Sequence, residues 1–292
     1  MRRLAQIVVF TSVCLSISTP LVNAQNTNCP PDSASDSDNK GHSGQEVSIS
    51  GVTFSGFVQL PIVDQDRIAS SIKQQSYDTV DGVIGEGLER VRAGWQNRGY
   101  FKVQVTDEGS TVTSTADGQR VVLSVHVDEG SQYTLGGITF RNNRAISNLT
   151  ALRALFPIKD GEIFARERIA MGLENLRKAY GQFGYINYTG VPLTTFDDER
   201  KLAFLEIAID EGRQFYLTRV DILGLDGPSK RKVLKDMRVG QIYNQRLFQL
   251  SLEKHASLLR FSHDDPSHVA KRLDERMGTV EIMLDARPCL VH

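Results

Sequence analysis

The sequence lacks the features by which most enzymes and nucleic-acid-binding proteins are recognised. Its 34 Lys and Arg residues are matched by 35 Asp and Glu residues, so there is no positive excess with which to bind a phosphate backbone. It contains no nucleophile elbow, phosphate-binding loop or metalloprotease helix motif. These absences argue against catalysis, bound cofactors, small-molecule substrates and nucleic-acid partners.

Cysteine is also scarce, with Cys14, Cys29 and Cys289 the only three in 292 residues. Cys14 lies in an apolar leader without the context of a lipidation site, and the other two lie near opposite ends of the remaining chain. An oxidising compartment permits a disulfide, but a row of domains would separate these ends. Two free thiols or an intermolecular disulfide are therefore as compatible with the sequence as a Cys29–Cys289 disulfide.

No apolar run near the N-terminus is long enough for a comfortable membrane span. The run after Arg2 and Arg3 covers residues 4 to 17, whereas a span needs about 20 residues. Together with the small residue at the end of Val22-Asn23-Ala24, it predicts a secretory signal peptide over residues 1–24. Residues 25–46 are rich in Asn, Ser, Asp, Gly and Pro, which predicts a disordered leader.

What the sequence does contain is one pattern written three times. Four helix-spaced positions recur 85 residues later and, after a further 79 residues, a third time: Ile84, Leu88, Val91 and Trp95, then Ile169, Leu173, Leu176 and Tyr180, then Phe248, Leu252, His255 and Leu259. Each set is followed by an alternating apolar pattern that ends at Asp128, Asp210 or Asp285. Internal repetition of this kind indicates tandem domains.

Within each repeat the apolar period changes in the same order. An extended opening precedes two helical stretches, and two runs of period two close the repeat. The order is β-α-α-β-β, which predicts an α+β fold with two helices on one face of a three-stranded mixed sheet. We assign the repeats to residues 47–130, 131–213 and 214–292, the third being divergent.

Four glycines mark turns between the predicted elements. Gly99 and Gly184 follow the second helix, where glycine can take the left-handed conformation that ends a helix. Gly130 and Gly212 close an Asp-Glu-Gly sequence after the last strand, which indicates a polar turn. The adjacent carboxylates could instead be a catalytic pair, but their recurrence at one architectural place favours a structural turn.

The penultimate strand of each repeat is predicted to lie at the sheet edge, because proline and charge are tolerated there. In the first repeat we expect this strand to be Phe101, Lys102, Val103, Gln104, Val105 and Thr106, with Phe101, Val103 and Val105 facing the helices. An exposed edge can accept a partner strand by β-augmentation. An edge that is merely protected against aggregation explains the same residues equally well.

Three histidines, His255, His263 and His268, lie close together in the third repeat and raise the question of a metal site. His255 occupies a helix position that apolar residues fill in the other repeats, so we expect it to face the core. The sequence therefore assigns no metal site.

The repeats resemble POTRA domains, the β-α-α-β-β modules of BamA-type outer-membrane assembly proteins and of two-partner secretion transporters. The resemblance rests on the Gly-Tyr turns at 99–100 and 184–185, the Asp-Glu-Gly exits, and the strand openings 137–143 and 220–225. It covers residues 47–292, although the third repeat lacks the Gly-Tyr turn. Such modules usually precede a membrane β-barrel, for which the residues after the last repeat leave no room, so barrel activity is not expected.

The resemblance implies a non-enzymatic, exported scaffold or chaperone-like module, free in the periplasm or peripheral at the outer membrane. Its expected partners are unfolded outer-membrane or secreted polypeptides, or an outer-membrane barrel assembly complex. The alternative is a structural interaction protein of the cell envelope or division machinery, which an uncleaved N-terminal anchor would favour.

Overall fold

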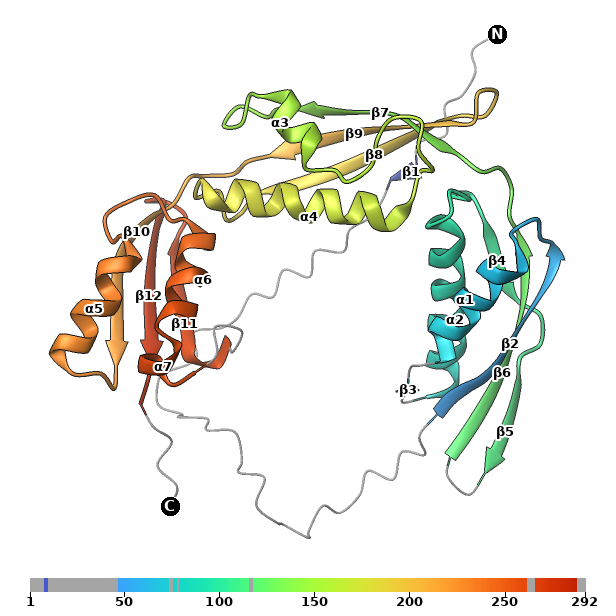
Figure 1. Ribbon diagram of the computed structural model, residues 1–292, viewed down its shortest axis with the longest axis horizontal. Coiled ribbons are helices and arrows are strands. Elements are labelled where there is room, and N and C mark those ends of the chain that lie inside the picture. Colours follow the sequence, from blue (N-terminus) through green and yellow to red (C-terminus); the bar gives the residue numbers. More distant parts are fainter. Residues whose placement is uncertain are drawn as a thin grey trace.

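The computed structural model describes Val8–Val9 and residues 47–287, apart from 74–75, 78, 116–117 and 262–265. Three sheets with their helices follow one another along the chain, and we call them units 1, 2 and 3 (Figure 1). The three cysteines, the predicted leader and all but two residues of the predicted signal peptide lie outside the described residues. In the described part of the chain, no helix is both long and apolar enough to cross a membrane.

Unit 1 contains β2 (Val47–Phe57), α1 (Ile62–Lys73), β3 (Ser76–Tyr77), α2 (Val80–Gln96), β4 (Gln104–Asp107), β5 (Thr111–Thr115) and β6 (Gly118–Asp128). The strands run in the order β3-β2-β6-β4, and β5 lies beside β6 on the same side as β4. The expected penultimate strand is therefore split in two. Gly109, with φ at +92°, lies at the break between the halves.

Unit 2 contains β7 (Thr134–Arg141), α3 (Leu149–Ala154), α4 (Arg166–Gln182), β8 (Thr189–Asp197) and β9 (Leu202–Asp210). Its strand order is β1-β8-β9-β7, where β1 is the two-residue strand Val8–Val9. The prediction that the penultimate strand lies at the edge is therefore wrong for unit 2, because β1 pairs with β8 on the side away from β9. The short helix α3 begins after Asn148, whose side chain accepts a 3.0 Å hydrogen bond from the Ala151 amide. This cap satisfies one of the amides that a helix start leaves unpaired.

Unit 3 contains β10 (Tyr216–Leu223), α5 (Gly227–Met237), α6 (Gln245–Lys254), α7 (Ala256–Leu259), the 3₁₀ turn η1 (Pro266–His268), β11 (Val269–Asp274) and β12 (Thr279–Asp285). Its strand order is β10-β12-β11. The unit has the predicted strand pattern, but its second helix is interrupted at His255, which ends α6 and precedes α7.

One sheet plan is common to the three units. The last strand is central, the first strand runs parallel to it on one side, and the penultimate strand runs antiparallel on the other. A bulge shifts the register near the start of each first strand, between Ile49 and Gly51, between Leu135 and Gly137, and between Leu217 and Arg219. The predicted α+β class and mixed sheet are confirmed, with additional short strands in units 1 and 2.

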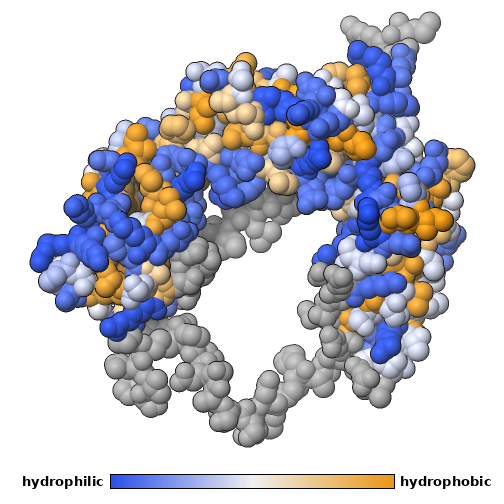
Figure 2. Space-filling model, in the orientation of Figure 1, coloured by the Kyte–Doolittle hydropathy of each residue, from blue (hydrophilic) through white to orange (hydrophobic). Residues whose placement is uncertain are grey.

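Each unit has its own hydrophobic core between sheet and helices. The repeated helix positions supply much of it, since the following are buried: Val91, Trp95, Leu176, Tyr180, Leu252 and Leu259. His255 is also buried, as predicted, and its Nε2 lies 2.8 Å from Oδ2 of Asp236. Within the described ranges, no three His, Cys, Asp or Glu residues are grouped so as to hold a metal ion. On the visible surface hydrophobic and hydrophilic residues are interspersed (Figure 2).

Candidate functional site: the edge strand and the joints between units

The predicted edge strand of unit 1 lies at the edge of its sheet, but it begins later than expected. Strand β4 starts at Gln104 and pairs with β6 from Gln104 opposite Asp128 to Asp107 opposite Val125. Val103 and Val105 are buried against the helices, as predicted. The side chains of Gln104 and Thr106 are exposed on the other face.

The hydrogen bond after β4 shows which amides are turned toward solvent. The Glu108 amide donates to the Ser124 carbonyl at 2.8 Å, so position 108 faces β6. Because amides along an antiparallel strand point alternately to and from the neighbour, those of Gln104 and Thr106 also face β6. The amides of Val105 and Asp107 then point away from the sheet, where a further strand could accept them.

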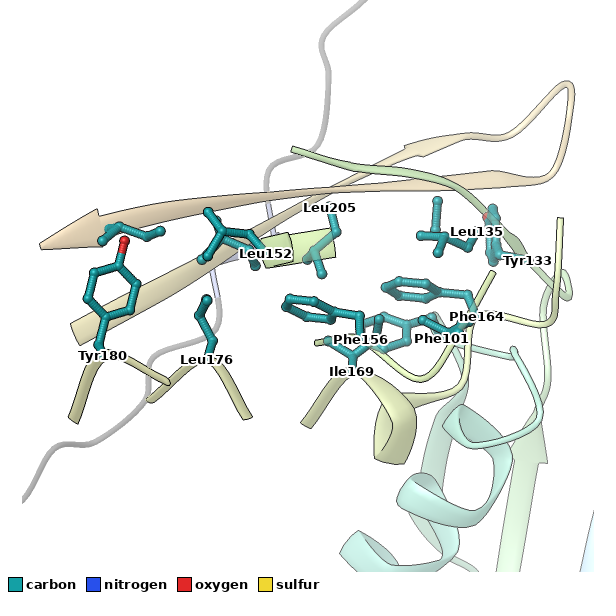
Figure 3. Packing of buried hydrophobic residues seen from close by; sticks show 14 of the residues in the cluster. Phe101, Tyr133, Leu135, Leu152, Phe156, Phe164, Ile169, Leu176, Tyr180 and Leu205 are labelled. Atoms are coloured by element: carbon teal, nitrogen blue, oxygen red, sulfur yellow. The ribbon is translucent and has the colours of Figure 1, made fainter. Parts of the chain in front are cut away.

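Phe101 does not face the helices of unit 1, and that prediction was wrong. Its ring lies in the core of unit 2 beside Phe164 (Figure 3). The centroid of the Phe101 ring is 5.1 Å from that of Phe164 and 5.6 Å from that of Phe196. The chain at this point is still in a turn, closed by a bond from the Val103 amide to the Tyr100 carbonyl. Strand alternation therefore does not yet apply, and the side chain crosses into the next unit.

Lys102 also belongs to the contact between units 1 and 2. Its Nζ lies 2.7 Å from Oδ1 of Asp198 and 5.1 Å from the centroid of the Phe196 ring. The Tyr133 hydroxyl donates to the same carboxylate. These hydrogen bonds, from Lys102 and then from Tyr133, hold the pKa of Asp198 below its usual range. The first two residues of the predicted edge strand thus position unit 2 and are not at the edge.

Gly99 lies at the centre of this joint. Its φ of +89° confirms the predicted left-handed turn. Its carbonyl accepts a 2.9 Å bond from the Tyr133 amide, which starts unit 2. A Cβ at position 99 would lie 2.8 Å from Cγ2 of Ile163 and 2.8 Å from the Tyr133 carbonyl oxygen. Glycine is therefore required both by the backbone conformation and by the close approach of the next unit.

The joint between units 2 and 3 repeats this geometry. Gly184 has φ at +82°, and its carbonyl accepts a 2.9 Å bond from the Phe215 amide. A Cβ here would lie 2.8 Å from Cγ2 of Ile242. Ile186, which corresponds to Phe101, packs against the core of unit 3. Two joints built in the same way indicate that the Gly-Tyr sequences specify how one unit meets the next.

The Asp-Glu-Gly exits contain a structural element that sequence reasoning missed. Gly130 and Gly212 have φ at +64° and +65°, as the predicted turns require. Glu129, however, is only 1% exposed and accepts three hydrogen bonds, from the amides of Gln59 and Leu60 at 2.7 and 2.9 Å and from Nε1 of Trp95 at 2.8 Å. One carboxylate therefore connects the end of unit 1 to its second helix and to the loop after its first strand.

Glu211 plays the same part in unit 2, where it accepts from the Ala145 amide at 2.7 Å and from the Tyr180 hydroxyl at 3.1 Å. Burial, with the Glu211 carboxylate adding to it, raises the pKa of Tyr180. In unit 3 the two positions hold Ala286 and Leu259, both buried. The glutamate after the last strand and the Trp or Tyr of the second helix are thus both present in units 1 and 2 and both absent from unit 3. This joint occurrence across the repeats is the sequence signal that could have revealed the contact.

Comparison with known proteins gives the same fold. The POTRA family model, described as "Surface antigen variable number repeat", matches residues 133–212, which lie in unit 2. The crystal structure of Haemophilus influenzae BamA POTRA3-5 is similar with a TM-score of 0.61 and 19% identity, covering 85% of this chain and 99% of that chain. Residues 133–212 thus match the POTRA family, and the three units together have the fold of three successive POTRA domains.

Two curated relatives extend the resemblance in sequence. A Treponema pallidum protein named for outer membrane protein assembly is 26% identical over 252 residues, which are 83% of this chain and 29% of the relative. The assembly factor BamA of Buchnera aphidicola is 21% identical over 221 residues, 71% of this chain and 34% of the relative. The chain thus spans about a third of the length of these relatives, and it resembles the POTRA part of BamA-type assembly factors.

Proposed function

We propose that the chain is a non-enzymatic periplasmic scaffold in outer-membrane protein assembly or secretion, and that unfolded outer-membrane or exported polypeptides bind to it by adding a strand at β4. The observation that carries this proposal is the orientation of the Val105 and Asp107 amides at a sheet edge with which no other described strand pairs. On the same side, the Val105 carbonyl accepts a 3.4 Å hydrogen bond from Nη2 of Arg92, which an incoming strand would replace. The POTRA folds and the relatives named for outer-membrane assembly support the setting.

Strand addition accounts for the kind of ligand that such a scaffold needs. Main-chain hydrogen bonds supply most of the affinity in this mode, so any extended segment can bind. Strand β4 has four residues, and only two of its amides point outward by the alternation above. Binding is therefore weak, tolerant of sequence and rapidly reversible, as suits a protein that handles many unfolded polypeptides in turn.

The test is a proline that removes one outward donor. In Val105→Pro the lost amide is one that makes no bond to β6, and proline is tolerated at such edge positions. We expect this variant to fold and to lose affinity for a labelled peptide taken from one barrel strand. Thr106→Val, which changes an exposed side chain and leaves the outward amides intact, is the matched control and should bind as the wild type does.

The outcomes separate two functions. Equal binding by a folded Val105→Pro variant would refute strand addition at β4. If the wild-type chain bound none of a set of barrel-derived peptides, the remaining role would be that of a docking scaffold, either on a barrel assembly complex or in another cell-envelope assembly. The two joints, which share one geometry, would suit that role.

A further inference from the structure

The second half of the split edge strand in unit 1 is unlike the first half and unlike the penultimate strands of the other units. Strand β5 reads Thr-Val-Thr-Ser-Thr from Thr111 to Thr115, with neither charge nor proline. By contrast, the other edge strands on this side of their sheets carry charge: β11 contains Lys271 and Arg272, and β4 contains Asp107. Charges and proline are the usual means by which sheet edges avoid pairing with other chains. β5 has strong β-formers in their place.

This strand is also accessible. Within the described residues it pairs only with β6, and Thr111 to Ser114 are exposed. Figure 1 shows the β5–β6 hairpin projecting beyond α1 and α2, at the end of unit 1 farthest from unit 2. As far as the described residues go, the backbone on the far side of β5 is therefore available to an incoming strand.

The sequence of β5 is close to a palindrome about Thr113. In an antiparallel pair with a second β5, Thr111 would lie opposite Thr115, Val112 opposite Ser114, and Thr113 opposite its own copy. Hydroxyl and β-branched pairs of this kind are favourable across antiparallel strands, and no like charges meet. A contact in which each copy presents the same surface is the arrangement that two-fold dimers require.

We propose that β5 is a self-association site. Two copies of this chain pair their β5 strands antiparallel, with a two-fold axis at Thr113, so that the unit 1 sheet of one copy continues into the unit 1 sheet of the other. The contact uses β5 and leaves the outward amides of β4 free, so it goes beyond the scaffold function proposed above. Because the strand has only five residues, the interface is small and the dimer is weak and dependent on concentration.

Sedimentation velocity of the exported protein over a concentration series tests this, with reductant present so that its cysteines cannot cross-link. We expect the wild type to shift from monomer toward dimer as concentration rises. Thr113→Lys and Thr113→Glu should each lose this shift, because each places like charges opposite one another at the axis. A one-to-one mixture of the two variants should regain it, since a lysine of one copy then faces a glutamate of the other. Thr106→Lys, an exposed position on β4, should associate as the wild type does.

Any result other than these would overturn the proposal. A wild type that stays monomeric throughout, a Thr113→Lys variant that still dimerises, or a mixture that fails to recover would each exclude pairing at Thr113. Loss of association in Thr106→Lys as well would point to a general effect of charge. Unfolding followed by the fluorescence of Trp95 confirms that each variant retains the fold of unit 1, and no peptide is involved, so the result is independent of strand addition at β4.

Discussion

Nε1 of Trp95 donates a 2.8 Å hydrogen bond to Oε1 of Glu129, and the two side chains are 0% and 1% exposed. The carboxylate also accepts from two consecutive backbone amides, so its charge is buried with its hydrogen-bonding capacity largely used. Burial of a carboxylate is tolerated only with such partners. Since Trp95 is the only tryptophan in the chain, its fluorescence reports on this contact and on unit 1 alone.

Glu129→Ala should destabilise unit 1 strongly. The substitution leaves two backbone amides and the indole N–H buried without partners, and each unsatisfied group costs about 1–3 kcal/mol. We expect the free energy of unfolding of unit 1 to fall by at least about 3 kcal/mol, measured by denaturant titration followed through Trp95 fluorescence. Glu211→Ala, the corresponding change in unit 2, should leave the Trp95 transition in place. A Trp95 transition unchanged in Glu129→Ala would mean that the carboxylate is dispensable.

Comparing Gly99→Ala with Gly130→Ala separates the two reasons for which glycine is needed, namely the left-handed backbone conformation and the close approach of neighbouring atoms. Both residues have positive φ, but a Cβ at 99 meets Ile163 and the Tyr133 carbonyl, whereas a Cβ at 130 has nothing within 4 Å. Gly130→Ala should therefore cost only the left-handed conformation, about 1–2 kcal/mol. Gly99→Ala should cost more and should also change the angle between units 1 and 2. Residual dipolar couplings of the two units would measure that angle, and equal effects of both substitutions would contradict the joint described here.

Phe101→Ala should weaken unit 2, although the residue belongs to unit 1 by sequence. Its ring is 8% exposed within the core of unit 2, and removing a buried phenylalanine typically costs about 3–5 kcal/mol. Hydrogen exchange should speed up in β7 and β9 while the Trp95 transition stays in place. Val103→Ala, two residues on, should have the opposite pattern because Val103 lies in the core of unit 1. If Phe101→Ala accelerated hydrogen exchange in unit 1 only, the position of the Phe101 ring in the core of unit 2 would be contradicted.

The contact of Asp198 with Lys102 and Tyr133 should depend on pH. The folded pKa of this carboxyl is lowered, by the hydrogen bonds from Lys102 first and Tyr133 second. Its stabilising effect is therefore complete above the unfolded pKa of about 3.9 and is lost as the pH falls through the folded value. Thermal unfolding of wild type and Asp198→Asn should differ at neutral pH and converge in strong acid. A difference that persists unchanged to low pH would show that the charge is not involved.

The repeat order, the sheet plan and the edge position of the penultimate strand in units 1 and 3 follow from the sequence because they depend on local periodicity. In unit 2 the pairing of β8 with β1 joins residues more than 180 positions apart, which no local pattern encodes. Alternating residues before Asp128 and helix-spaced residues around Val91 are each read within one element. The turn glycines are predictable for the same reason, since a left-handed residue after a helix is a local requirement. His255 could be assigned to the core because the corresponding positions in the other repeats, Val91 and Leu176, are apolar.

Contacts between elements are where sequence reasoning ended. The sequence pattern places Phe101 in a strand, but the turn at Tyr100 directs its side chain into the next unit. The spacing of apolar residues within unit 1 contains no information about this contact. The split between β4 and β5 depends on a positive φ at Gly109, which glycine allows without requiring. The three bonds to Glu129 join residues about 34 to 70 positions away, which no local pattern records.

Hydrogen exchange of the β4 amides, measured by NMR with and without an unfolded peptide from an outer-membrane barrel strand, tests the central claim most directly. We predict that Gln104 and Thr106 are protected in both states, and that Val105 and Asp107 exchange freely in the free protein and become protected in the complex. Saturating peptide that leaves Val105 and Asp107 unprotected, with shifts confined to the helices, would contradict strand addition as the way this scaffold binds its polypeptides.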